Sequence, residues 1–275
     1  MTSTVLSRAV IFVAAVIASP TVIAFQGTGS PPPLAYPLNK LPTDAEIASA
    51  LLGNDDRLKE VIIRRSKELP SHALRAGTVK AIGDEVIKIT RELQSRFNRD
   101  PLSVNEGNSN SEYVISLAEV LMRQMHPAGI DGLVAVVQLG APGGALVEFG
   151  EAAVPALINV ARTEPEDEPG HADAAMDVLV KMLESPTIRR TLSGTSRAAM
   201  RQVAAQRLAN TTGDDNWHML ATAAYLAVAT RDSGLRKQVM ELMDNDAEFV
   251  QRSMSIRRQQ NVSAIARRAL AVFPQ

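Results

Sequence analysis

The chain has 275 residues, no cysteine, only 4% aromatic residues and a formal net charge of −1 at pH 7. The absence of cysteine excludes disulfides, thiolate nucleophiles and cysteine-ligated zinc. The near-neutral charge and the scarcity of stacking rings disfavour nucleic acid as a partner. The buried surface must come from Ala, Leu, Val, Ile and Met, which favours helices over strands.

The first 24 residues have the pattern of a secretory signal. A short segment with one positive charge, residues 1–8, precedes the uninterrupted apolar run Ala9–Ala18, and a small-residue cleavage pattern ends at Ala24. The run is shorter than the ~20 residues that a membrane span needs. We expect cleavage after Ala24 and an exported protein of bacterial type, periplasmic or extracellular. We expect no later segment to be apolar enough to span a membrane, and so no membrane association after cleavage.

The next part of the chain predicts a linker, a helical segment and a second linker. Residues 25–40 are dense in Gly and Pro and predict an extended linker. Residues 41–97 predict an N-terminal helical segment, which begins with Thr43 as an N-cap and includes a long helix from Ser71 to Phe97. Residues 98–111 are polar and rich in turn formers, so we place the internal domain boundary there.

From Glu112 to the C-terminus, helical patterns follow one another closely. Helices are predicted at 113–125, 130–139, 146–162, 171–183, 196–209, 215–229, 234–243 and 247–273. No stretch shows the sustained alternation of a strand. The sequence therefore predicts an all-α protein with a second helical domain over residues 112–275.

The segment Gly150–Ile158, GEAAVPALI, resembles the first helix of a HEAT repeat. The glycine permits a sharp turn, the small residues allow close helix approach, and Pro155 lacks an amide donor and bends the helix. The next helix, Asp173–Leu183, carries apolar residues on one face, as a second repeat helix should. The pattern Ala152–Val154 recurs as Ala198–Met200, 46 positions later, which is within the ~40–47 residues of such a unit.

The resemblance implies that residues 112–275 form a right-handed, HEAT-like helical solenoid; an irregular helical bundle is the alternative. Such repeat proteins present extended surfaces to partners, and they commonly act as scaffolds or adaptors. We therefore expect binding of an unidentified protein or peptide partner, without a cofactor. A helical carrier of an apolar ligand is a further hypothesis, which the Met and Ala content favours.

One loop and the start of the helix after it contain the densest set of possible metal ligands. These residues are Glu164, Glu166, Asp167, Glu168, His171 and Asp173. Carboxylates suit Ca²⁺ or Mg²⁺ and a histidine suits Zn²⁺, so a metal-dependent enzyme is an alternative function. The spacing is not that of an EF-hand, however, and a solvated loop with acids near a helix N-terminus explains the same residues.

No catalytic motif is present in the sequence. The H-E-x-x-H, G-x-S-x-G and P-loop patterns are all missing. Asp214 and His218 could orient a general base, but no placed nucleophile accompanies them. We do not expect an enzyme, and we interpret Trp217 between these two residues as a core residue or a groove anchor.

Four arginines lie in the predicted terminal helix: Arg257, Arg258, Arg267 and Arg268. Arg257 and Arg268 are eleven residues apart, which is three helical turns and nearly one face. Such a row could dock an acidic partner, although a solvated helix face has the same pattern. Together with Trp217, these arginines are the predicted binding residues.

Overall fold

The computed structural model describes residues 37, 40–99, 108–162, 170–210, 220–245, 247–253 and 256–273. Their contacts divide the chain into two compact units, with the boundary between Ala135 and Val136. Each unit is described by itself below, as the N-terminal and the C-terminal unit. The predicted signal and almost all of the predicted linker lie outside the described residues, so both stay predictions.

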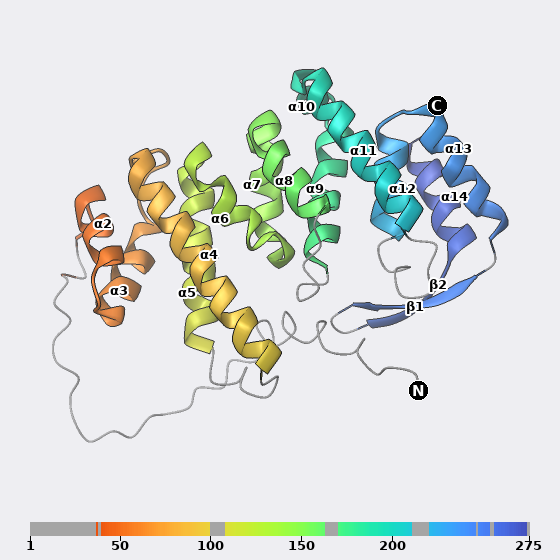
Figure 1. Ribbon diagram of the computed structural model, residues 1–275. Helices are drawn as coiled ribbons and strands as arrows, with labels where there is room; N and C mark the ends of the chain where they lie inside the picture. Colours follow the sequence, from red (N-terminus) through yellow and green to blue (C-terminus); the bar gives the residue numbers. More distant parts are fainter. Residues whose placement is uncertain are drawn as a thin grey trace. The chain divides into compact units, whose positions relative to one another are not determined.

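The described part of the N-terminal unit is helical (Figure 1). Its helices are α2 (Asp44–Leu52), α3 (Asp56–Ser66), α4 (Ala76–Arg99), α5 (Asn108–Gln124) and α6 (Ile130–Val134), with the 3-10 turn η2 (Pro127–Gly129) before α6. Helix α2 packs against α3 and α4 against α5. Between these two pairs, α2 contacts α4 and α3 contacts α5, while α6 packs on α4. The helices thus form two neighbouring pairs with buried apolar residues between them.

The predicted helix start at Thr43 is confirmed. The Thr43 hydroxyl accepts a hydrogen bond from the Glu46 amide at 3.3 Å, and the Glu46 carboxylate accepts one from the Thr43 amide at 2.8 Å. This reciprocal arrangement satisfies amides that have no partner within the helix. A hydrogen bond from Lys40, together with the Thr43 bonds, lowers the pKa of Glu46 to about 2.

The long helix begins at Ala76, not at Ser71 as predicted. The residues before it form a turn in which His72 has a φ of +60°. The amide of Leu74 donates to the side-chain oxygen of Gln124 at 3.0 Å, so this turn is held by a side chain of α5 and not by helical bonds.

The polar stretch 98–111 does not separate the two compact units. Helices α4 and α5, which it joins, pack against each other within the N-terminal unit, and α5 already begins at Asn108. Turn-forming composition shows where helices stop, but it does not show whether the helices on either side share a core.

The C-terminal unit consists mainly of helices (Figure 1). They are α7 (Ala141–Phe149), α8 (Val154–Arg162), α9 (His171–Glu184), α10 (Pro186–Thr191), α11 (Gly194–Asn210), α12 (Leu220–Ala229), α13 (Ser233–Glu241) and α14 (Val262–Val272), with 3-10 turns η3 (Val137–Leu139), η4 (Gly150–Ala153) and η6 (Leu242–Asp244). The predicted helix over 171–183 is confirmed almost to the residue. The short helix α10 was not predicted.

Three helix pairs follow one another in this unit. Helix α8 packs against α9, α11 against α12, and α13 against α14. The first members of successive pairs touch each other, α8 with α11 and α11 with α13, and so do the second members, α9 with α12 and α12 with α14. Aliphatic side chains such as Leu157, Leu179 and Leu226 fill these seams and are fully buried.

The GEAAVPALI segment is not a single helix. Gly150 has φ +57° and ψ −127° and begins the turn η4, and α8 starts only at Val154. The predicted sharp turn at the glycine is therefore confirmed. Pro155 is the second residue of α8, where a missing amide costs little because first-turn amides have no partner within the helix. It starts the helix and does not bend it, which corrects the predicted role.

The predicted terminal helix over 247–273 is wrong in its first half. Residues Glu248–Ser253 (β1) and Ile256–Asn261 (β2) form an antiparallel strand pair, with Glu248 opposite Asn261 and Ser253 opposite Ile256. Helix α14 begins only at Val262, where the Asn261 side chain accepts the Ala264 amide at 3.2 Å. Asn261 is thus the boundary between a strand pair and a helix within residues 247–273, which the helical pattern had predicted to be one helix.

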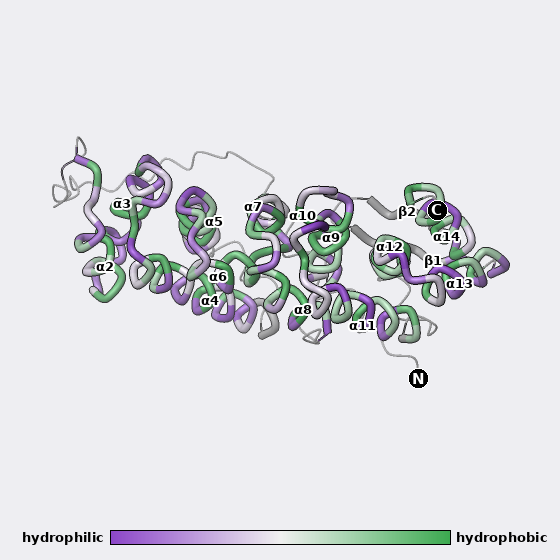
Figure 2. The backbone as a smooth tube through the Cα atoms, turned by 90° about the horizontal axis from the view of Figure 1, so that it is seen from above, coloured by the Kyte–Doolittle hydropathy of each residue, from purple (hydrophilic) through white to green (hydrophobic). Residues whose placement is uncertain are grey.

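The helical run Ala141–Arg162, formed by α7, η4 and α8, is long and apolar enough to cross a membrane by length and composition alone. The expectation that no such segment follows the signal is therefore wrong. The turn at Gly150 interrupts the run, and both α7 and α8 pack against α9. Figure 2 shows apolar and polar residues alternating around the helices of this unit. The packing of α7 and α8 against α9 accounts for the apolar residues of the run.

Candidate anion-binding pocket

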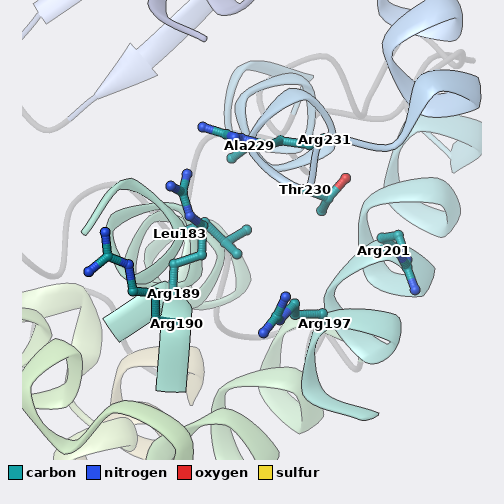
Figure 3. Close-up of a pocket in the computed structure, with 8 residues that line it drawn as sticks. All are labelled: Leu183, Arg189, Arg190, Arg197, Arg201, Ala229, Thr230 and Arg231. Atoms are coloured by element: carbon teal, nitrogen blue, oxygen red, sulfur yellow. The ribbon is translucent and has the colours of Figure 1, made fainter. Parts of the chain in front are cut away.

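A pocket of about 420 Å³ lies in the C-terminal unit, among α9, α10, α11 and the end of α12 (Figure 3). Five of the eight described residues that line it are arginines. The lining comprises Leu183, Arg189, Arg190, Arg197, Arg201, Ala229, Thr230 and Arg231. Its volume is within the range of ligand-binding clefts.

Short-range structure brings these arginines together. Helix α10 begins at Pro186 after the N-cap Ser185, and its last turn carries Arg189 and Arg190. Arg197 and Arg201 are four residues apart on α11, and both lie on the side of the helix that borders the pocket. Arg231 follows the end of α12.

The backbone fixes two of the pocket arginines. The guanidinium of Arg197 donates through Nε and Nη2 to the Leu192 carbonyl, at 3.1 and 2.8 Å. Arg231 has a φ of +59°, and its amide donates to the Val228 carbonyl at 3.1 Å, which closes the end of α12. This left-handed conformation is uncommon for a residue other than glycine, and it sets the direction in which the arginine leaves the helix.

Glu151, from the GEAAVPALI segment, holds the wall of the pocket in place. Its carboxylate accepts hydrogen bonds from the Ser196 hydroxyl at 2.6 Å, the Ser193 hydroxyl at 2.7 Å and the Ser193 amide at 3.0 Å. The bond from Ser196 in particular, with help from Ser193 and the charge of Arg197, lowers the pKa of Glu151 against the opposing effect of partial burial. An ionised carboxylate therefore fixes the first turn of α11, from which Arg197 projects.

The pocket arginines form no ion pairs with carboxylates in the part of the chain that the structure describes. Among the described residues, no ion pair involves Arg189, Arg190, Arg201 or Arg231, and Arg197 bonds a backbone carbonyl. All five are at least partly accessible to solvent. In a chain with a net charge of −1, this is a concentrated positive site, and guanidinium groups match carboxylates and phosphates in geometry.

The predicted binding residues lie elsewhere. Arg257 and Arg258 belong to the strand β2 and not to the helix α14 that carries Arg268, so the predicted row on one helix face is not formed. Arg267 and Arg268 are exposed on α14. Neither Arg267 nor Arg268 is among the described residues that line the pocket. Trp217, with the neighbouring Asp214 and His218, lies outside the described residues.

The predicted metal ligands are largely untested by the structure. Glu164, Glu166, Asp167 and Glu168 lie outside the described residues. His171 is buried at the start of α9, and the Asp173 carboxylate accepts a hydrogen bond from the Thr222 hydroxyl at 2.6 Å. Within the part of the chain that the structure describes, no three His, Asp or Glu residues gather as a metal site would require.

Sequence reasoning missed the arginine pocket because its arginines come from three separate segments: α10, α11 and the turn after α12. One local signal was available, namely Arg197 and Arg201 four residues apart in a predicted helix. Comparison of the chain with protein-family models, with curated proteins and with solved structures finds no match. The candidate site therefore rests on the geometry and charge of this chain alone.

Proposed function

We propose that this chain is an exported scaffold or adaptor protein, built from HEAT-like helical repeats, that acts by binding a protein or peptide partner. The pairing of helices supports the repeat interpretation. Helices α8, α11 and α13, the first members of the three pairs, begin at residues 154, 194 and 233, so the spacing is 40 and then 39 residues. That is close to the length of a HEAT or armadillo unit.

The arginine pocket is the observation that carries the binding function. Its arginines are at least partly accessible to solvent, it lies where the pair α11–α12 meets α9 and α10, and no ion pair of the described residues involves these arginines. Its described lining includes no His, Asp or Glu that could act as a general base, and the Thr230 hydroxyl donates to the Ala227 carbonyl at 2.7 Å. Such a lining supports recognition of a ligand more than its chemical conversion.

A single engineered cysteine tests this function, because the natural chain has none and a crosslinker would attach at one position only. In the chain from Phe25 onward, Ala198→Cys places the crosslinker on the exposed surface of α11 between Arg197 and Arg201. Met240→Cys on α13, where the residue is 48% exposed, is the matched control outside the pocket lining. Both variants are exposed to the exported proteins of the source cells and crosslinked.

We expect the Ala198→Cys variant to capture a defined polypeptide that the Met240→Cys variant does not capture. Adding Arg197→Gln and Arg201→Gln to the Ala198→Cys chain should abolish that capture. If the same proteins crosslink equally from both positions, or if none crosslinks from position 198, the proposed function is contradicted.

A further inference from the structure

We propose that the arginine pocket binds an acidic segment of the partner protein, in which at least three carboxylates lie within about four consecutive residues. This inference rests on the proposed function and specifies the ligand that the pocket takes. The first argument is charge. Five guanidinium groups surround about 420 Å³, and a ligand with a single negative charge would leave most of them unpaired.

The second argument is the placement of the arginines around the pocket. They enter it from α10, from α11 and from the turn that follows α12 (Figure 3). A ligand that pairs with all three groups must present negative charges in several directions. An extended run of acidic residues does so, because successive side chains along an extended chain point to opposite sides.

The third argument is the rest of the lining. Leu183 and Ala229 are buried apolar residues that form part of the pocket surface, and the hydroxyl of Thr230 already donates to a carbonyl of its own helix. The described lining offers no aromatic ring on which a base could stack. These features fit the carbon chains of Glu and Asp better than they fit a nucleic acid.

The fourth argument is that part of the site is ordered before a ligand arrives. Two bonds to the Leu192 carbonyl hold Arg197, and the bonds from Ser193 and Ser196 to Glu151 hold the helix that carries it. A guanidinium that is already oriented loses less conformational freedom when it binds a carboxylate.

Fluorescence anisotropy with short labelled peptides tests the proposal on the full chain from Phe25 onward. The probe is a hexapeptide with four consecutive glutamates between terminal glycines. The reference peptide has glutamines in place of the glutamates, and inorganic tripolyphosphate is a second anion. We expect the glutamate peptide to bind in ~50 mM salt, its affinity to fall steeply as salt is raised, and the glutamine peptide to bind at least about tenfold more weakly.

A matched pair of double variants locates the binding site. Arg190→Gln with Arg201→Gln removes two exposed pocket arginines, and we expect the affinity for the glutamate peptide to fall at least tenfold. Arg267→Gln with Arg268→Gln makes the same change of charge on α14, outside the pocket lining, and should leave the affinity within about twofold. Far-UV circular dichroism and the melting temperature verify that both variants are folded.

Three results would overturn the proposal. They are equal loss of affinity in the two double variants, no binding of the glutamate peptide at millimolar concentration, and binding of tripolyphosphate without binding of the peptide.

The crosslinking experiment distinguishes failure of the acidic-segment proposal from failure of the proposed function. A partner that is captured from position 198 but not displaced by the glutamate peptide would leave the proposed function standing and refute the acidic segment as its ligand.

Discussion

Glu151 and Ser196, 45 positions apart in the chain, are joined by a hydrogen bond of 2.6 Å from the serine hydroxyl to the carboxylate. Glu151 lies in the turn η4 that precedes α8, and Ser196 lies in the first turn of α11, the corresponding helix of the next pair. The bond therefore connects two successive helix pairs. It also ends one residue before Arg197, so the packing of the pairs and the position of a pocket arginine depend on the same contact.

Glu151→Gln should destabilise the C-terminal unit and weaken binding at the pocket. The amide keeps the size of the side chain but loses the charge that strengthens the bonds from Ser193 and Ser196. We expect the free energy of unfolding to fall by about 1–2 kcal/mol and the affinity for the glutamate peptide to fall several-fold. Chemical denaturation and peptide anisotropy measure the two effects. Glu148→Gln, one turn earlier and exposed, is the control, and equal effects of the two changes would contradict the role of Glu151.

The contribution of Glu151 to stability should depend on pH. Its pKa in the folded protein is lower than the ordinary value of 4.5, so the folded state favours the ionised carboxylate. The stabilisation is therefore fully present above pH 4.5 and is lost as pH falls through the lowered pKa. We expect the stability difference between the natural chain and Glu151→Gln to be constant from pH 7 to 5 and to shrink below pH 4.5. A difference that is unchanged at pH 3 would show that the charge is not responsible.

Glu46 also titrates at low pH, with a pKa lowered to about 2 by the hydrogen bonds from Lys40 and Thr43. Its contribution is the same in the natural chain and in Glu151→Gln, so it cancels from the comparison. It adds a second loss of stability to both chains as pH falls below 4.5 through its own lowered pKa.

Local sequence patterns predicted the helices well where their stability is local. The buried stripe of α9 and the cap at Thr43 need only residues three or four positions apart, and both are as predicted. The segment 247–261 was misjudged because a helical reading placed Arg257 and Arg268 on one face, whereas β1 and β2 pair with each other through backbone bonds. Residue spacing alone does not predict the pairing of β1 with β2.

The candidate site could be predicted only in part. The motif around Gly150 indicated where the helix pairs begin, and the predicted turn there is present. The pocket, however, depends on which helix ends lie close together in space. Arg231 reaches it from the end of α12, and Arg190 reaches it from the short helix α10, which the sequence pattern did not predict. The four C-terminal arginines are close together in the sequence, yet residues that are close along the chain need not form one site in space.

Gly132→Ala should destabilise the N-terminal unit. Helices α4 and α6 pack against each other, and an added Cβ at Gly132 would lie 2.6 Å from the Cα of Gly83 and 2.9 Å from Leu121 Cδ1. Backbone cannot yield to this overlap without moving a helix, so we expect a loss of about 1–3 kcal/mol in unfolding free energy. Gly77→Ala on α4 has open space around it and should be neutral or stabilising by up to ~1 kcal/mol. Equal denaturation midpoints for the two variants would refute the close crossing.

Gly150→Ala should destabilise the C-terminal unit through the backbone and not through a steric clash. The nearest atom to an added Cβ would be Ile188 Cγ2 at 3.8 Å, an ordinary contact distance, but the φ of +57° and ψ of −127° suit glycine almost alone. We expect a loss of about 1–3 kcal/mol. Gly144→Ala on α7, which also has open space around it, is the control and should not lower stability.

Because Gly150 precedes Glu151 directly, relaxation of the strained turn should also displace the carboxylate that holds α11. Gly150→Ala should therefore weaken glutamate-peptide binding in the same assay, and a chain that lost stability but kept full affinity would show that the turn and the pocket are independent.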